Sequence, residues 1–504
     1  MRRYYNNLCS LLVAALLLSI LLDSCQDTWD SHYQTEESTN RELLLSKAEA
    51  SSELSTFVGL LEKVGYDSVL LYPQAYTVFA PVNEAFDGLS DEVINDPVQL
   101  NALLGNHICR FSYTSLDADE SPRIRMLNGK YEDFTISDGE ANFGGAALVS
   151  QDIIAGNGIL HTIGSLVAVK PNIWSYMLQS DEFPKIMSYL TPYNSMSFDV
   201  DNSVAIGKNT LGEVIYDSVF VASNSYFSVI GDLNSEENSY TFLGLPDDVY
   251  NTVYTRFEPY YSLPDPAAVT STVDKVIMDN LVISGVSKSE LTGSYRRTST
   301  GTWIAVSESE VVSETKLSNG YLFVMNEMNL DPKLVVYKSS RFEVEDTEGR
   351  TIGKTSDLTI QKKYDISASG YFKNEVSLLV APDASNSNNY FEVSFDEVAS
   401  ASYYIYIKFA PVGASASCEL KYELSYSNMD GTTTTVPIEG GLVTNDLNER
   451  VKIGDTYTFP VYVNRSENST YSVKLKVFVD VSDAELVLYT REFGIDYIEL
   501  VPAQ

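Results

Sequence analysis

Histidine, tryptophan and cysteine are scarce in this chain of 504 residues, which has three His, three Trp and four Cys. The three histidines, His32, His107 and His161, leave few places for a metal cluster or for a Ser–His or Cys–His catalytic pair. Basic residues are also few, since 34 Lys and Arg stand against 69 Asp and Glu and the net charge is −35. Such an acidic chain repels nucleic acid over a long range, so nucleic acid is excluded as a partner.

Signature motifs of enzymes are missing as well. The sequence has no GxSxG elbow, no P-loop, no HExxH and no Cys/His ligand cluster. What it does have is 44 % hydrophobic and 12 % aromatic residues, which is enough apolar material for folded domains. We therefore expect a folded protein of several domains that is not an enzyme and needs no cofactor.

The only long apolar run, Leu8–Leu22, has fifteen residues. It is short for a bilayer core of about 30 Å and typical of a signal peptide. The run leads into Asp23-Ser24-Cys25, which resembles the lipobox of bacterial lipoproteins, where the Cys becomes the lipidated first residue. We expect a lipoprotein signal peptide over 1–24, a lipid on Cys25 and a polar tether over 25–42. An ordinary signal peptide followed by a free thiol is the alternative.

Location follows from these resemblances. Asp67-Ser68-Val69 and Asp217-Ser218-Val219 resemble O-glycosylation acceptors of Bacteroidetes-type bacteria. Together with the lipobox, they imply a lipoprotein of the outer membrane, held to the membrane by its N-terminal lipid and exposed at the cell surface.

Two motifs recur in the chain at almost the same separation. Phe79 precedes Gly158 by 79 positions, and Phe242 precedes Gly320 by 78. An internal repeat of this kind indicates two domains of one design. The segments that carry the motifs are Tyr76–Phe86, Asp152–Val167, Tyr240–Tyr250 and Lys316–Leu330.

These segments resemble the two signature blocks of fasciclin-like domains, TVFAPxNxAF and NGxIHxI. A third block, His107–Asp117 and again Asn280–Leu291, resembles the central strand and turn of the family. The resemblance implies two α+β domains, one over 43–170 and a divergent second one over 171–333. The second diverges because Phe323 stands where the first has His161.

Local patterns agree with an α+β domain. Phe57, Leu61 and Val64 recur at helical spacing and predict an amphipathic helix. Asp96-Pro97 reads as an N-cap followed by a proline at the first helical position. We expect His161 to be hydrogen-bonded inside the fold.

The family resemblance also implies adhesion through protein–protein contacts. Some animal relatives engage receptors with an Asp-Ile pair just before the second block, and Asp152-Ile153 lies at the matching place. Asp152 and Ile153 are therefore candidate partner-binding residues. In the alternative, the Asp152 side chain caps a turn.

After about residue 333 the pattern changes to strict alternation. Ile405, Ile407 and Phe409 alternate with polar or tyrosine positions, which predicts a β-sandwich over 334–504. The two ends of this region resemble family-6-type carbohydrate-binding modules and their galactose-binding-like relatives, which are jelly rolls. The fold class we predict is thus two α+β fasciclin-like domains followed by an all-β jelly-roll sandwich.

In those modules, residues matching Glu343, Glu345 and Asp496 hold a structural calcium ion, which implies the same here. The alternative is that the two glutamates are solvated on a strand. The modules bind sugars on exposed aromatic rings, and the region lacks Trp, so the Tyr371-Phe372 pair is the candidate ligand site.

Two functions follow. The first is a cell-surface lipoprotein that mediates adhesion or protein–protein interaction through its fasciclin-like domains. The second is capture of a polysaccharide by the C-terminal sandwich for an outer-membrane uptake system.

Overall fold

The computed structural model divides the chain into two compact units, residues 1–171 and 172–504. It describes residues 42–503 except 73, 120–122, 209–213, 337–338, 345, 353–357, 364–365, 368–369, 372–374, 381–389, 411–415, 445–448 and 468. None of the helices described there is both long and apolar enough to cross a membrane. The predicted signal peptide, Cys25 and nearly all of the tether lie outside the described residues.

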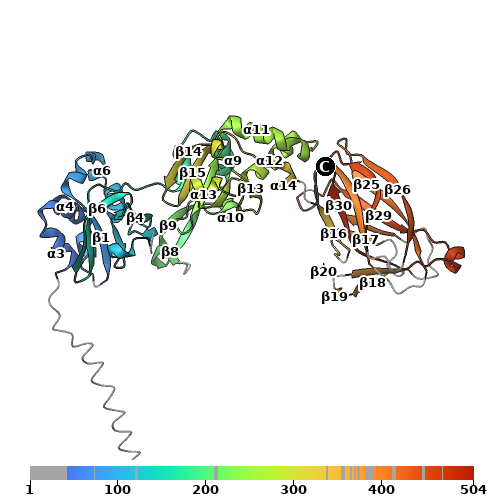
Figure 1. The fold of residues 1–504 in the computed structure, drawn as a ribbon, viewed down its shortest axis with the longest axis horizontal. Coiled ribbons are helices and arrows are strands. Elements are labelled where there is room, and N and C mark those ends of the chain that lie inside the picture. Colours follow the sequence, from blue (N-terminus) through green and yellow to red (C-terminus); the bar gives the residue numbers. More distant parts are fainter. Residues whose placement is uncertain are drawn as a thin grey trace, which may run out of the picture. The chain divides into compact units, whose positions relative to one another are not determined.

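The first unit contains one seven-stranded sheet with helices beside it, which we call the first domain (Figure 1). The strand order is β2-β1-β7-β6-β5-β4-β3, and β1 and β7 run parallel. The strands are β1 (Tyr76–Pro81), β2 (Ile108–Arg110), β3 (Arg123–Arg125), β4 (Tyr131–Ser137), β5 (Glu140–Phe143), β6 (Ala146–Ala155) and β7 (Gly158–Ile163). The helices are α3 (Leu44–Glu49), α4 (Ser55–Val64), α5 (Tyr66–Val69), α6 (Asp91–Asn95) and α7 (Pro97–Gly105).

The helical signals of the first domain are confirmed. Phe57 and Leu61 of α4 are fully buried, and Val64 packs against the same core cluster. Helix α7 begins at Pro97, and the Asp96 carboxylate accepts hydrogen bonds from backbone N–H groups of its first turn. Both patterns are local, so the sequence alone could locate them.

The second unit begins with another α+β domain, which we call the second domain. Its sheet has the order β11-β10-β15-β14, and β10 and β15 again run parallel. The strands of that sheet are β10 (Tyr240–Gly244), β11 (Val282–Ser284), β14 (Val311–Leu317) and β15 (Gly320–Met325). Two separate hairpins are β8 (Asn194–Lys208) with β9 (Val214–Asn224), and β12 (Arg296–Arg297) with β13 (Trp303–Ile304). The helices are α8 (Ile173–Gln179), α9 (Pro184–Leu190), α10 (Phe227–Ile230), α11 (Asp247–Phe257), α12 (Pro266–Met278), α13 (Lys288–Thr292) and α14 (Pro332–Val335).

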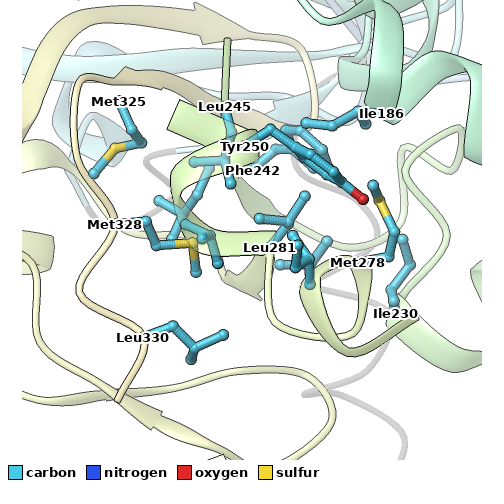
Figure 2. Packing of buried hydrophobic residues seen from close by; sticks show 14 of the residues in the cluster. Ile186, Ile230, Phe242, Leu245, Tyr250, Met278, Leu281, Met325, Met328 and Leu330 are labelled. Atoms are coloured by element: carbon cyan, nitrogen blue, oxygen red, sulfur yellow. The ribbon is translucent and has the colours of Figure 1, made fainter. Parts of the chain in front are cut away.

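The core of the second domain is large and almost wholly apolar. Phe242 from β10, Tyr250 from α11 and Leu281 beside β11 are at most 2 % exposed. Figure 2 shows these side chains together with Met325 and Met328 in one interior. Burial of this kind stabilises a domain by about 25 cal/mol for each Å² of apolar surface removed from water.

The two domains share their strand register, which corrects one expected correspondence. In the first domain Phe79 pairs with His161, and in the second Leu243 pairs with Phe323. Phe79 therefore corresponds to Leu243, and the expected match of Phe79 with Phe242 was wrong by one residue. Both central strands are buried on both faces, so alternation could not fix their register.

The rest of the second unit is a β-sandwich, as the alternation predicted. One sheet has the order β18-β21-β30-β24-β27, with β16 also paired to β30, and the facing sheet has the order β17-β22-β29-β25-β26. Ile405 and Ile407 of the first sheet and Leu475 of the second share one buried cluster. The strands of the first sheet are β16 (Ser340–Glu343), β18 (Leu358–Lys363), β21 (Glu375–Val380), β24 (Ser402–Ala410), β27 (Arg450–Thr458) and β30 (Phe493–Pro502). Those of the second are β17 (Arg350–Ile352), β22 (Tyr390–Ser394), β25 (Cys418–Ser427), β26 (Thr433–Val443) and β29 (Val473–Val479). Short pairs are β19 (Ile366–Ser367) with β20 (Gly370–Tyr371) and β23 (Glu397–Val398) with β28 (Val463–Asn464).

Candidate functional site

Asp152 lies in a bulge of β6. The pairing of β6 with β7 skips from Ser150 to Ile153, and Asp152 has a φ of +59°, in the left-handed region. Its carboxylate accepts hydrogen bonds from the backbone N–H and the hydroxyl of Ser115, at 2.8 Å and 2.5 Å. The side chain therefore caps the turn that begins at Ser115, while Ile153 is half-buried and packs against the core. Whether the Asp152-Ile153 pair contacts a partner stays a prediction.

His161 is fixed in one neutral form. Its Nε2 lies 2.9 Å from the carbonyl oxygen of Tyr113, and its Nδ1 faces the backbone N–H of Asp152 at 3.3 Å. A carbonyl only accepts and an N–H only donates, so Nε2 carries the proton. The ring is fully buried and stacks on Phe79, and burial lowers its pKa below the ordinary value. His161 is thus hydrogen-bonded inside the fold.

His107 is held in the opposite tautomer. Its Nδ1 donates to the carbonyl oxygen of Leu103 at 2.9 Å, and its Nε2 accepts from the backbone N–H of Val167 at 3.1 Å. The ring is completely buried, and burial lowers its pKa to about 4. Burial likewise raises the pKa of the Cys109 thiol to about 12, so that side chain stays protonated at neutral pH. These groups support the fold and offer no nucleophile or base.

Exposed apolar side chains surround the Asp152 turn. Leu116 is 82 % exposed, Phe111 70 % and Ile154 62 %. A hollow of about 530 Å³ lies between the segment before β1, the segment after β2 and the β6–β7 turn. Thr114, next to the capped Ser115, lines this hollow together with Ile154. We call Phe111, Leu116, Ile154 and the hollow the Asp152 surface.

The predicted calcium ligands are brought together only in part. Glu343 ends β16, and Asp496 lies on the paired strand β30, next to the partner of Glu343 in the ladder. Asp496 is 2 % exposed, whereas the Glu343 carboxylate lies 2.8 Å from Nε of Arg341. Glu345 lies outside the described residues. In the part of the chain that the structure describes, no three His, Cys, Asp or Glu residues are grouped to hold a metal ion, and the calcium site stays a prediction.

The predicted sugar-binding pair is described at one of its two positions. Tyr371 ends the short strand β20, where it pairs with Ile366 of β19. Phe372 lies outside the described residues. The aromatic site in the sandwich therefore also stays a prediction.

A second aromatic surface was not singled out by the sequence. Tyr404 and Tyr406 of β24 and Tyr497 of β30 lie on the outward side of the larger sheet. Cationic side chains from β16 and β27 lie over their rings. The alternation of β24 was visible in the sequence, but the pairing that joins strands more than 90 positions apart was not.

Comparison with known families accounts for the first domain. Residues 52–168 match the family model of the Fasciclin domain. This region is a fasciclin-like α+β domain. It contains all seven strands of the first sheet, both buried histidines and the Asp152 turn.

Two curated relatives match with part of the chain. The protein sll1483 of a Synechocystis species is 23 % identical over 156 residues, which are 30 % of this chain and 86 % of the relative. The transforming growth factor-beta-induced protein ig-h3 of Sus scrofa is 30 % identical over 108 residues, which are 20 % of this chain and only 16 % of the relative.

Solved structures resemble both halves of the chain weakly. The fasciclin domain pair of the insect cell adhesion molecule Fasciclin I is 14 % identical, with a TM-score of 0.24, and covers 56 % of this chain and 99 % of its own. The CBM22-1 xylan-binding domain of Paenibacillus barcinonensis Xyn10C is 15 % identical, with a TM-score of 0.22, and covers 34 % and 98 %.

Proposed function

We propose that this protein is a cell-surface adhesion or protein-interaction protein and that the Asp152 surface of its fasciclin domain binds a protein partner. The observation that carries the proposal is a contrast within the first domain. The histidines, the Cys109 thiol and Asp152 are all engaged inside the fold, while Phe111, Leu116 and Ile154 remain exposed. Exposed apolar groups beside a hollow are typical of a protein–protein contact. No comparison points to an enzyme.

The partner surface can be tested on intact cells. The full chain with Cys25→Ala, which removes the predicted lipid, is added to cells of the producing organism from which its gene has been deleted. We expect Leu116→Asp with Ile154→Asp to weaken cell binding at least about tenfold, because two apolar contacts are replaced by charges. Val98→Asp is the matched control, since Val98 is 78 % exposed in the same domain on α7. Equal binding by all three proteins would overturn the proposal.

We propose that a lipid on Cys25 anchors the protein in the outer membrane, at the cell surface. This proposal rests on the sequence around Cys25, and more than one acyl chain there would hold the protein firmly, at about 0.8 kcal/mol per buried methylene. We expect Cys25→Ala to move the protein from the membrane fraction to the soluble fraction. Protease treatment of intact cells reports whether the native protein faces outward.

A second function is polysaccharide capture by the C-terminal sandwich. It is favoured by the array of Tyr404, Tyr406 and Tyr497 on one sheet face, because tyrosine hydroxyls can form hydrogen bonds with sugar hydroxyls. Retention of the full chain on immobilised glycans tests this function separately from cell binding.

A further inference from the structure

The outward face of the larger sandwich sheet is built from four neighbouring strands. In the order β16, β30, β24, β27, the ladders align Arg341 with Glu499, Glu499 with Tyr406 and Tyr406 with Lys452, so these residues form one row across the sheet. The residues that define this tyrosine–cation face are Arg341, Tyr404, Tyr406, Arg450, Lys452 and Tyr497. In Figure 1, β16 and β30 lie side by side in this sheet.

Each ring of this face lies under a cation. The Arg341 guanidinium is 3.4 Å from the centroid of the Tyr497 ring, and that of Arg450 is 3.9 Å from the Tyr406 ring. The Lys452 ammonium is 4.3 Å from the Tyr404 ring. A guanidinium stacked on an aromatic ring keeps its N–H edges available for hydrogen bonds in its own plane. A ligand that approaches the sheet therefore meets cations first and tyrosine hydroxyls beside them.

The charge of this face is opposite to that of the protein. Four cations, counting Lys408 of β24, stand against the three carboxylates of these strands that are not buried, those of Glu343, Asp455 and Glu499, which leaves +1, while Asp496 of β30 is buried. The whole chain carries −35. A positive face on so acidic a protein creates a local positive electrostatic potential, which attracts an anionic ligand.

The opposite sheet provides a contrast. Its strands β22, β25 and β29 also carry lysines outward, and two of them lie within 4 Å of glutamates. On these three strands, three lysines stand against three glutamates, so their net charge is zero. Its charged residues are Lys421, Lys474, Lys476, Glu392, Glu419 and Glu423.

The arginines keep donors after their contacts within the face. Glu343 is contacted by Nε of Arg341 at 2.8 Å, and Glu499 by Nη2 of Arg450 at 2.7 Å. Each guanidinium has five N–H donors, so one nitrogen is used and the other two can bind a further carboxylate.

We propose that the tyrosine–cation face binds an acidic polysaccharide, through uronate carboxylates on the cations and sugar hydroxyls on the tyrosines. The inference rests on the second function proposed above, polysaccharide capture, and names its ligand class. A uronate polymer carries its charges farther apart than nucleic acid, whose duplex has one charge per about 1.7 Å. The overall charge of −35 therefore opposes nucleic acid more strongly than it opposes a uronate polymer.

The test compares two forms of one polymer. Binding of the full chain to polygalacturonate and to fully methyl-esterified polygalacturonate is measured by affinity electrophoresis, with single-stranded DNA as a third probe. We expect polygalacturonate to bind at least about tenfold more tightly than its neutral ester, and raised salt to weaken that binding.

Substitutions locate the binding. Arg450→Gln with Lys452→Gln should weaken polygalacturonate binding about tenfold or more, since each change removes a charge-assisted hydrogen bond. Lys452→Gln alone removes no ion pair of the described residues and should still weaken it several-fold. Lys474→Gln with Lys476→Gln removes the same charge from the opposite sheet and should leave binding unchanged. Melting curves report whether each variant is folded.

Each other result contradicts a defined claim. Equal binding of the acidic polymer and its ester would overturn the ligand class and leave polysaccharide capture standing. Binding to neither polymer would overturn both the acidic ligand class and the capture function of this face for a polygalacturonate backbone. Tighter binding to DNA, or equal loss in the variants of both sheets, would overturn the assignment of the face to a uronate ligand.

Discussion

The first and second domains share one framework and differ in what fills it. In both, an Asn-Gly turn opens the parallel strand: Asn157 Oδ1 accepts from the backbone N–H of Leu44 at 2.9 Å, and Asn319 Oδ1 accepts from that of Ile173 at 2.8 Å. These bonds fasten the first helix of each domain to the central sheet. A polar side chain repeated at this place in two otherwise divergent sequences is therefore required by the fold.

The threonine after the first tyrosine of the central strand is also shared. Thr77 Oγ1 donates to Phe111 O and accepts from the Tyr113 N–H, both at 2.8 Å. Thr241 makes the same two bonds with the carbonyl and the N–H of Val286. Each hydroxyl closes the turn that follows the neighbouring strand, β2 or β11.

The buried histidines and the bulge at Asp152 belong to the first domain alone. The ladder places Leu281 and Phe323 of the second domain where the first has His107 and His161. Strand β14 pairs with β15 without a break at Glu314, the position that corresponds to Asp152. The fold thus does not require the buried histidines or the Asp152 turn.

The largest effect is expected at the shared glycines. A Cβ at Gly158 would lie 1.9 Å from the Tyr76 carbonyl oxygen, and one at Gly320 would lie 1.8 Å from that of Tyr240. Gly158→Ala and Gly320→Ala should each destabilise their own domain by more than about 4 kcal/mol, because the two central strands must separate. Limited proteolysis and calorimetry of the full chain measure this.

Gly129→Ala is the control for the glycines. Gly129 has a φ of +82° but open space around it, so the change should cost only about 1 kcal/mol. A loss at Gly158 no larger than that at Gly129 would contradict the shared framework.

The second largest loss of stability is expected at the asparagines that open the parallel strands. Asn157→Ala should cost the first domain about 3 kcal/mol, because the Leu44 N–H and the Leu70 carbonyl lose their partner. Asn319→Ala should cost the second domain at least as much, since Asn319 is fully buried. Chemical unfolding measures both. Asn95→Ala, at an exposed hydrogen bond, should change stability by less than about 0.5 kcal/mol; a similar loss there would contradict the account.

A pH effect should separate the two domains. The unfolded chain protonates His107 near its ordinary pKa of 6.5, whereas the folded domain holds the ring neutral to a pKa of about 4. Protonation therefore favours unfolding, and the first domain should lose about 2 kcal/mol of stability between pH 7 and pH 5. The second domain contains no histidine, so it lacks this contribution to the pH dependence of stability. Domain-resolved melting curves measure it.

His107→Leu gives the first domain the residue type that the second domain has at the corresponding position, Leu281. It should lower stability at pH 7, because the bonds to Leu103 and Val167 are lost, and flatten the pH dependence. A variant that kept the full slope would show that another group causes it.

The smallest effect is expected at Asp152. Asp152→Asn keeps an acceptor for the Ser115 N–H and weakens the bond to its hydroxyl, so it should cost about 1 kcal/mol. Glu314→Gln, at the exposed corresponding position of the second domain, should cost nothing measurable. Equal losses of stability from the two substitutions would contradict the structural difference between the two domains at this position.

Local rules explain what the sequence predicted well. The α4 periodicity, the Asp96 cap and the alternation of β24 each depend on residues close together in the chain, and all three are confirmed. The β8–β9 hairpin over Asn194–Asn224 was not predicted, although two long strand-like segments flank its turn. It lies where the second domain departs most from the repeat, so no motif drew attention to it.

Long-range pairing explains what the sequence could not predict. The Asp152 bulge depends on how β6 pairs with β7, and the contact with Ser115 spans 37 positions. The tyrosine–cation face also depends on the pairing of β24 with β27 and β30, which lie far from it in the chain, whereas the pairing of β16 with β30 was implied by the resemblance of the two ends to carbohydrate-binding modules. Spacing along the sequence carries no information on such contacts until the strand order is known.

The central claim is that the first domain carries the partner surface and the second supplies the same framework without it. The most direct measurement compares binding of the full chain to gene-deleted cells for Ile154→Asp on β6 and Val312→Asp on β14. Both residues are exposed, at 62 % and 63 %, and they lie on the strands that pair with β7 in the first domain and with β15 in the second. We predict that Ile154→Asp weakens binding several-fold and that Val312→Asp leaves it unchanged. Equal loss in both variants, or loss in Val312→Asp alone, would contradict the claim.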